Sequence, residues 1–139
     1  MFENAVGMAV LAASDLSRAQ TFWHDVFGLD PVVTEEGAAT YVIGGVPVLV
    51  YESQFAGTAK STSFSILTDD LDRDMAELRA KGVTFNDYDL GDLTTVDGVA
   101  DLAGERGAWF DDTEGNIIAI AQPEGDILER ARALRASRA

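Results

Sequence analysis

Apolar side chains recur at helical spacing in two segments of the chain, Leu16–Phe27 and Leu71–Ala80. Apolar side chains that repeat every three or four positions are typical of an amphipathic helix, one face of which is buried in a hydrophobic core. Each segment follows residues that cap helix N-termini and precedes a glycine, the residue that most readily ends a helix. These flanking residues are Ser14-Asp15 with Gly28, and Asp69-Asp70 with Gly82.

The two helix openings are similar to each other. One reads Asp15-Leu16-Ser17-Arg18, and the other reads Asp70-Leu71-Asp72-Arg73, 55 residues further along the chain. Such self-similarity at a fixed offset indicates an internal duplication. We therefore expect two copies of one supersecondary unit.

Short apolar runs around the helices predict the strands of each copy, one before the helix and about three after it. In the first copy the runs are Val6–Ala13, then Val32-Val33, Thr40–Ile43 and Val46–Tyr51. In the second they are Phe64–Leu67, then Val83–Phe85, Ala108–Phe110 and Ile117–Gln122. The Gly44-Gly45 pair predicts a tight hairpin turn.

The pattern as a whole predicts an α+β fold of two modules, over about residues 5–55 and 61–122. No low-complexity linker separates them, so we expect residues 1–125 to form a single domain. The acidic stretch 86–107 predicts a loop with one short strand. A third apolar stripe after Asp126 predicts a C-terminal helix or tail over residues 126–139.

Composition and charge restrict the partners. The 139 residues include no cysteine, so there is no disulfide and no thiolate, and we expect a cytoplasmic protein. Ten basic residues stand against 24 acidic ones, a formal net charge of −14, which argues against nucleic acid and anionic membranes. No apolar run is long enough to span a bilayer. The acidity either serves solubility alone or favours a cationic ligand, and both interpretations stay open.

Several motifs resemble the vicinal oxygen chelate superfamily, which includes glyoxalases, bleomycin-resistance proteins and extradiol dioxygenases. They are Ser14–Ala19, Phe22-Trp23 and Phe27–Leu29 in the first half, and Asp69–Leu71, Leu78–Val83 and Trp109–Ile118 in the second. Two more stretches, Tyr51–Thr58 and Thr95–Val99, are similar to a smaller bacterial subgroup without a settled activity. The resemblance implies tandem βαβββ modules whose mixed sheets curve into a half-barrel, with the site on the concave face.

The resemblance also implies where the family holds its divalent metal. The ligand positions fall at Met8, Ser63 and Ala119, with a fourth near Leu49–Glu52. The side chains at the first three positions supply neither the imidazole nor the carboxylate by which the family holds its divalent metal. Glu52 supplies at most one carboxylate, and the single histidine, His24, lies on a predicted helix. We therefore expect no metal and no cofactor.

Alternation along the strands places small and apolar side chains where the ligands would stand. The resulting pocket would be lined by Met8, Val10, Tyr51, Ser63, Ser65, Trp109 and Ala119. Apolar and aromatic walls with a few hydroxyls suit a small organic molecule. The alternative is that these residues fill the core. Alanine and serine leave space that a core would fill, which favours the pocket.

Three functions remain, and the first leads. It is a metal-free protein that binds a small organic molecule and sequesters a drug or metabolite, as the bleomycin-resistance members do. The second is a lyase, isomerase or dioxygenase-like enzyme with an atypical or absent metal site, with Tyr51, Glu52 and Asp111 as candidate acids or bases. The third is an interaction module acting through a dimer face or the arginine-bearing tail. By analogy with the family we expect a homodimer.

Overall fold

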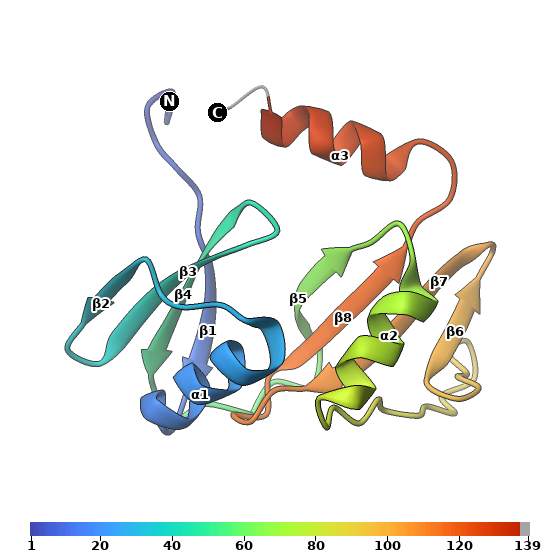
Figure 1. The fold of residues 1–139 in the computed structure, drawn as a ribbon. Helices are drawn as coiled ribbons and strands as arrows, with labels where there is room; N and C mark the ends of the chain where they lie inside the picture. The colour runs from blue at the N-terminus through green and yellow to red at the C-terminus, as the bar shows by residue number, and fades with distance from the viewer. Residues whose placement is uncertain (137–139) are drawn as a thin grey trace. The chain divides into compact units, whose positions relative to one another are not determined.

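The computed structural model describes residues 1–136 and divides into two compact units (Figure 1). Unit 1 consists of residues 1–60 together with the turn 112–116, and unit 2 consists of residues 61–111 and the chain from Ile117 onward. Each unit contains one four-stranded mixed sheet with a helix across it. Residues 137–139, the end of the predicted C-terminal helix or tail, lie outside the described residues.

The sheet of unit 1 has the order β1-β4-β3-β2. Its strands are β1 (Ala9–Ala13), β2 (Val33–Glu35), β3 (Ala38–Ile43) and β4 (Val46–Glu52). Strand β1 is parallel to β4, and the other two pairs are antiparallel. Gly44 and Gly45, with φ angles of 59° and 83°, join β3 to β4, a backbone shape that glycine adopts without steric cost.

Helix α1 (Leu16–Phe27) covers one face of this sheet. The Asp15 carboxylate caps it by accepting a hydrogen bond from the backbone N–H of Arg18 at 3.0 Å. Gly28, in the left-handed region, ends it. Trp23 from the helix and Tyr41 from β3 are fully buried against each other, with ring centroids 6.3 Å apart. Unit 1 therefore has an aromatic core on its helix side.

The turn 112–116 belongs to unit 1 and carries a buried carboxylate, Glu114, whose side chain is 1% exposed. Its Oε1 accepts the backbone N–H groups of Ser14 and Asp15 at 3.0 and 2.9 Å, and its Oε2 accepts Arg18 Nε at 2.7 Å. Gly57 lies against the same turn, where an added Cβ would meet the Glu114 carbonyl oxygen at 2.9 Å. The start of α1 is thus anchored by a residue about a hundred positions away.

The sheet of unit 2 repeats this plan in the order β5-β8-β7-β6. Its strands are β5 (Thr62–Leu67), β6 (Val99–Leu102), β7 (Glu105–Asp111) and β8 (Ile117–Gln122). Strand β5 is parallel to β8, and the remaining pairs are antiparallel. The first strand of each unit therefore pairs in parallel with the last, as expected for a duplicated βαβββ module.

Helix α2 (Leu71–Ala80) covers one face of the second sheet and buries Leu71, Met75 and Leu78. Asp70 caps it by accepting the backbone N–H of Arg73 at 3.0 Å. A third helix, α3 (Ile127–Ala136), follows β8. Arg132 on this helix lies 3.6 Å from Asp69, the residue before the α2 cap. No helix within residues 1–136 is long and apolar enough to cross a membrane.

The fold confirms the α+β architecture of tandem βαβββ modules and the positions of the helices. The strand predicted over Val6–Ala13 is shorter, because pairing with β4 begins only at Ala9 opposite Val48. The strand predicted over Val83–Phe85 is wrong: Phe85 alone makes a bridge, to Phe110, and β6 occupies the next part of that edge of β7. That the two modules form a single domain over residues 1–125 stays a prediction.

Candidate functional site

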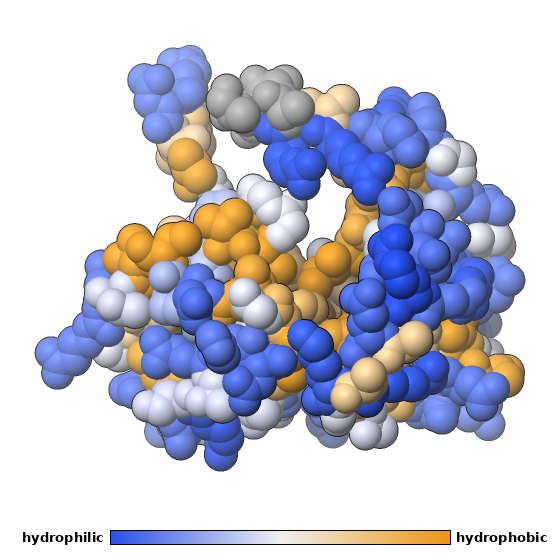
Figure 2. All heavy atoms as spheres, in the orientation of Figure 1, coloured by the Kyte–Doolittle hydropathy of each residue, from blue (hydrophilic) through white to orange (hydrophobic). Residues whose placement is uncertain are grey.

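Alternation gives each sheet one face toward its helix and one face away from it. In unit 1 the α1 side carries the buried residues Leu11, Tyr41 and Val50. We call the other side the α1-distal face and define it by Val10, Ala12, Thr40, Leu49 and Tyr51, which the register places together. Val10 is 53% exposed and Tyr51 is 40% exposed. Figure 2 shows hydrophobic side chains at the surface over the sheet of unit 1.

The corresponding α2-distal face of unit 2 contains a continuous row across three strands. Ser65 on β5 is the register partner of Ala119 on β8, and Ala119 is the partner of Trp109 on β7. Leu67 and Ala121 form the next pair along the same face. Sequence analysis placed Ser65, Ala119 and Trp109 in one pocket, and the register brings them side by side.

Polar and aromatic groups hold the Trp109 ring in place. Its Nε1 donates to Thr62 Oγ1 at 3.2 Å, and the Tyr88 ring meets it edge to face with centroids 5.8 Å apart. Asn86 Nδ2 donates to Tyr88 Oη at 3.2 Å and to Asp111 Oδ1 at 2.9 Å. The α2-distal face therefore has an aromatic wall beside a small polar cluster.

Thr62, Asn86 and Tyr88 were not predicted from the sequence to take part in this arrangement. Asn86 and Tyr88 lie in the stretch predicted as an acidic loop, where the surrounding aspartates conceal them. The signal was the alternation of Asn86 and Tyr88 directly after Phe85, the one residue of that run that bridges to β7.

The remaining predicted lining residues fall in different places. Met8 comes just before β1 and is 48% exposed. Ser63 lies at a shift in register between β5 and β8, so it has no direct partner on β8. Met8, Val10 and Tyr51 thus belong to unit 1, whereas Ser63, Ser65, Trp109 and Ala119 belong to unit 2.

The three candidate catalytic residues do not form one cluster. Tyr51 lies on the α1-distal face, and Glu52, the next residue of β4, points to the opposite side of the strand. Asp111 belongs to unit 2, where it is exposed and held by Asn86. Tyr51 and Glu52 therefore cannot both act from the same face of the sheet.

The register also resolves the fourth position at which the resemblance expects a metal ligand. Leu49 pairs with Val10 in unit 1 exactly as Ala119 pairs with Ser65 in unit 2, so Leu49 rather than Glu52 is the counterpart of Ala119. The four positions then carry methionine, serine, leucine and alanine, a set without a carboxylate or an imidazole. The residues present do not fit the family's metal.

Other potential ligands lie elsewhere. His24 is on α1, with its side chain 62% exposed and its Nδ1 2.8 Å from Asp30 Oδ1. Within residues 1–136, no group of three or more histidine or acidic side chains is arranged to hold a metal ion. The α1-distal and α2-distal faces offer apolar contact, ring stacking and hydrogen bonding by hydroxyl and amide groups, and the α2-distal face also carries the Asp111 carboxylate.

Comparisons with known proteins agree with this architecture. The family model described as "Glyoxalase/Bleomycin resistance protein/Dioxygenase superfamily" matches residues 5–120. Among curated proteins, none matches the chain by sequence.

Three solved structures show the likeness in fold. A glyoxalase/bleomycin resistance protein/dioxygenase from Alicyclobacillus acidocaldarius is 16% identical with a TM-score of 0.69, over 88% of this chain and 94% of that one. A lactoylglutathione lyase from Agrobacterium tumefaciens is 19% identical with a TM-score of 0.64, over 85% and 92%. A fosfomycin resistance protein from Mesorhizobium loti is 17% identical with a TM-score of 0.61, over 94% and 99%. At sequence identities below 20%, the similarity shows a shared fold only.

Proposed function

Because the chain belongs to the glyoxalase/bleomycin resistance protein/dioxygenase superfamily, we propose that it is a member that binds a small organic molecule without a metal. The observation that carries this proposal is the set of side chains at the four ligand positions, Met8, Leu49, Ser63 and Ala119. Methionine, leucine and alanine offer no oxygen or nitrogen donor, and a neutral serine hydroxyl alone is a poor ligand. Replacing four ligands by such residues leaves a surface suited to apolar and hydroxyl-bearing molecules.

The α2-distal face supplies the most complete set of contacts for such a molecule. Trp109 and Tyr88 provide flat apolar area, and the small side chain of Ala119, which is 7% exposed, lies next to Trp109 in the register. The Ser65 hydroxyl and the side-chain oxygen of Asn86 can orient polar groups of the ligand, while the Asn86 amide nitrogen donates to Tyr88 and Asp111. We propose this face as the primary binding surface in unit 2, and the α1-distal face as a separate candidate surface in unit 1.

The net charge of −14 favours a ligand that is neutral or cationic over an anion, because the field of the protein repels anions from its surface. We also propose that the protein sequesters a drug or metabolite, that it is located in the cytoplasm and that it forms a homodimer. The solved structures similar in fold include fosfomycin resistance proteins, and by analogy with their names we propose a role in resistance to a toxic molecule.

The experiment that tests this function measures binding by isothermal titration calorimetry, with bleomycin as a cationic probe and fosfomycin as an anionic one. We expect bleomycin to bind and Ala119→Trp to abolish its binding, because an indole at this position obstructs the surface beside Trp109. Ala76→Trp, on the exposed side of α2, is the matched control and leaves the affinity unchanged. An unchanged affinity in Ala119→Trp removes β8 from the site.

Elemental analysis of protein purified without a chelator or histidine tag tests the metal-free part of the proposal. We expect less than about one-tenth equivalent of divalent metal per chain, as the four non-ligating side chains require. About one equivalent, together with metal-dependent turnover, would overturn the binding function in favour of an enzyme.

A further inference from the structure

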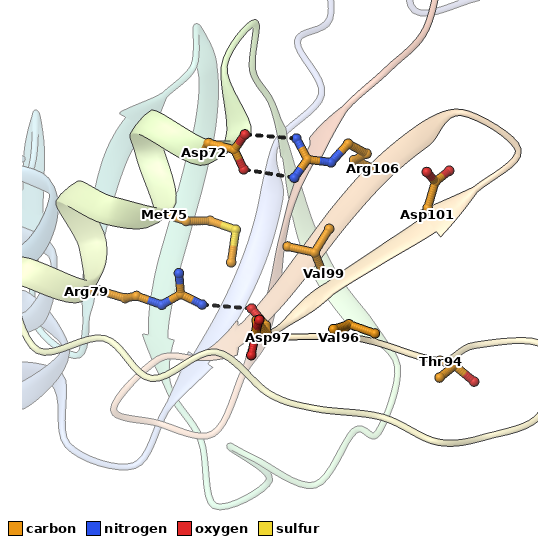
Figure 3. A pocket seen from close by; sticks show the side chains of 9 residues that line it. All are labelled: Asp72, Met75, Arg79, Thr94, Val96, Asp97, Val99, Asp101 and Arg106. Carbon is orange, nitrogen blue, oxygen red and sulfur yellow. Dashed lines mark hydrogen bonds and ion pairs between the residues drawn. The ribbon is translucent and has the colours of Figure 1, made fainter.

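A hollow of about 650 Å³ lies on the helix side of unit 2, between α2 and β6 (Figure 3). It is lined by Asp72, Met75, Arg79, Thr94, Val96, Asp97, Val99, Asp101 and Arg106. These residues come from α2, the loop before β6, and the strands β6 and β7. None of them belongs to the α2-distal face, so this hollow is separate from the proposed binding surface.

The middle of the hollow is apolar and its two ends are polar. Met75, which is 2% exposed, and Val99 form the middle, with Asp72 and Arg106 toward one end and Arg79 and Asp97 toward the other (Figure 3). A second hollow of about 510 Å³ adjoins the latter end, since Arg79 and Asp97 line both. Volumes of this size are within the usual range for small-molecule sites, about 300 to 1,000 Å³.

The charges of the hollow are unequally compensated. Arg106 donates from Nη1 and Nη2 to both carboxylate oxygens of Asp72, at 3.2 and 2.8 Å, so this pair neutralises itself. Arg79 Nη2 donates to the backbone carbonyl of Asp97 at 2.8 Å, and its guanidinium lies 5.2 Å from the centre of the Phe85 ring. Both arginines are therefore engaged by protein groups.

Two carboxylates are left with negative charge toward the hollow. Asp101 accepts one hydrogen bond, from the backbone N–H of Gly104 at 2.9 Å. The Asp97 carboxylate has no hydrogen bond or ion pair to any residue of the described chain. With three aspartates and two arginines in the lining, the hollow carries a formal net charge of −1. The hollow therefore disfavours binding of an anion, and its net charge of −1 is balanced by a ligand with one positive charge.

Asp97 lies on a tight turn that is closed by backbone hydrogen bonds between Val96 and Val99. Val96 and Val99 bridge across Asp97-Gly98, whose φ angles are 52° and 82°. The Gly98 N–H donates to Asp87 Oδ1 at 2.9 Å, and an added Cβ at Gly98 would meet Phe85 Cβ at 2.8 Å. This turn is part of the Thr95–Val99 motif, and its packing positions the backbone of Asp97 at the polar end of the hollow that Arg79 also lines.

We propose that this hollow binds a small organic monocation, with its ammonium group at Asp97 and its hydrocarbon part over Met75, Val96 and Val99. Val96 is 73% exposed, so covering it with a hydrocarbon removes apolar surface from water. The acidic field of the whole protein raises the local concentration of cations. The site is independent of the proposed function, because it shares no residue with the α-distal faces.

The test uses hexylamine as the probe, followed through the backbone amide NMR signals of the full chain. Hexanol and hexanoate have the same hydrocarbon length with a neutral and an anionic end, and both serve as controls. We expect hexylamine to shift the amides of residues 94–101 and of α2, and to bind about fivefold more tightly than hexanol, the effect of one exposed charge pair. Equal affinity for hexylamine and hexanol, or shifts confined to the α2-distal face, would overturn the proposal.

Two variants separate charge from folding. Asp97→Asn removes the charge and keeps the turn, because asparagine followed by glycine suits this turn well. It should weaken hexylamine binding about fivefold. Asp92→Asn removes an equally acidic, exposed residue of the same loop that does not line the hollow, and it should leave the affinity unchanged. Equal affinity in the two variants would assign the binding to general charge attraction and reject the site.

Discussion

The two helices α1 and α2 begin with the same sequence pattern, Asp-Leu followed two residues later by Arg, and are anchored in different ways. Each is capped by its aspartate, Asp15 or Asp70, through the same backbone contact at 3.0 Å. Beyond that cap, α1 depends on a buried charge from a distant turn. Helix α2 depends on a neutral amide and on polar groups near its own start.

The anchor of α1 concentrates five contacting groups on Glu114. Besides two backbone N–H groups and Arg18, the Glu114 carboxylate accepts the hydroxyls of Ser14 and Thr113 at 3.2 and 3.0 Å. Burial raises the pKa of Glu114, but the hydrogen bonds from Arg18, the Asp15 N–H and Thr113 outweigh it and hold that pKa at about 2. The ionised form is therefore the one that fits unit 1.

The anchor of α2 is distributed over weaker contacts. The backbone N–H of Leu71 donates to Gln122 Oε1 at 2.9 Å, and that of Asp70 donates to Thr68 Oγ1 at 3.1 Å. The Thr68 hydroxyl also contacts the Asp74 carboxylate. No buried charge is involved, so losing one contact leaves the others in place. The comparison shows that a duplicated motif can keep its cap while its supporting contacts diverge.

The largest expected effect is the loss of the Glu114 anchor. Glu114→Ala should lower the free energy of unfolding by about 3 kcal/mol, since it leaves two partly buried backbone N–H groups without their acceptor and Arg18 without its carboxylate partner. Gln122→Ala, the counterpart for α2, should cost about 1 kcal/mol. Urea unfolding monitored by circular dichroism measures both values. Equal losses would show that the two anchors are equivalent after all.

The pH dependence sharpens the same comparison. The pKa of Glu114 is about 2 in the folded chain against an ordinary 4.5, so its contribution is complete above about pH 4.5 and is lost as the pH falls toward 2. Burial raises the pKa of the neighbouring Asp112, which acts in the opposite sense in acid. The stability difference between the parent protein and Glu114→Gln isolates the first effect. We expect this difference to shrink steadily from pH 5 to pH 2.5 in urea titrations; a constant difference would contradict it.

The smallest expected change in stability comes from adding or removing one hydroxyl group in the hydrophobic core of each unit. Tyr41 in unit 1 is fully buried, and its Oη has no hydrogen-bond partner within residues 1–136. Tyr41→Phe should therefore stabilise the protein by about 1 kcal/mol, because it removes an unsatisfied hydroxyl and little else. Phe110→Tyr should do the reverse in the fully buried core of unit 2. Thermal unfolding checks both, and a destabilised Tyr41→Phe would indicate a buried partner for the hydroxyl.

The helices were predictable because their signals are local. Asp15 and Asp70 cap the two helices, and Gly28 ends α1, as the sequence predicted. The spacing of the apolar side chains predicts which face of each helix is buried. Strand ends depend on a partner that lies far away in the sequence. Residues 6–7 were predicted as part of a strand, but the pairing of β1 with β4 begins only at Ala9. Val83 was also predicted as a strand residue, and in its run only Phe85 forms a bridge.

The sequence predicted which strand positions of the candidate site share one face of the sheet. It did not predict which side chains contact one another there. Ser65 and Ala119 follow from alternation, and the register confirms that they share a face with Trp109. Their binding of a ligand stays a prediction. The contact of Tyr88 with Trp109 joins a loop to a strand, and the contact of Glu114 with α1 spans about a hundred residues. Neither can be read from local spacing.

The division of each sheet into a helix side and a distal side has an evolutionary consequence. The groups that hold α1 and α2, such as Glu114 and Gln122, contact the helix starts, whereas Ser65 and Ala119 point away from the helices. Substitutions in the distal rows can accumulate without loss of the helix anchors. Such a scaffold can acquire a new specificity by drift at a few positions, and its two copies are free to specialise separately.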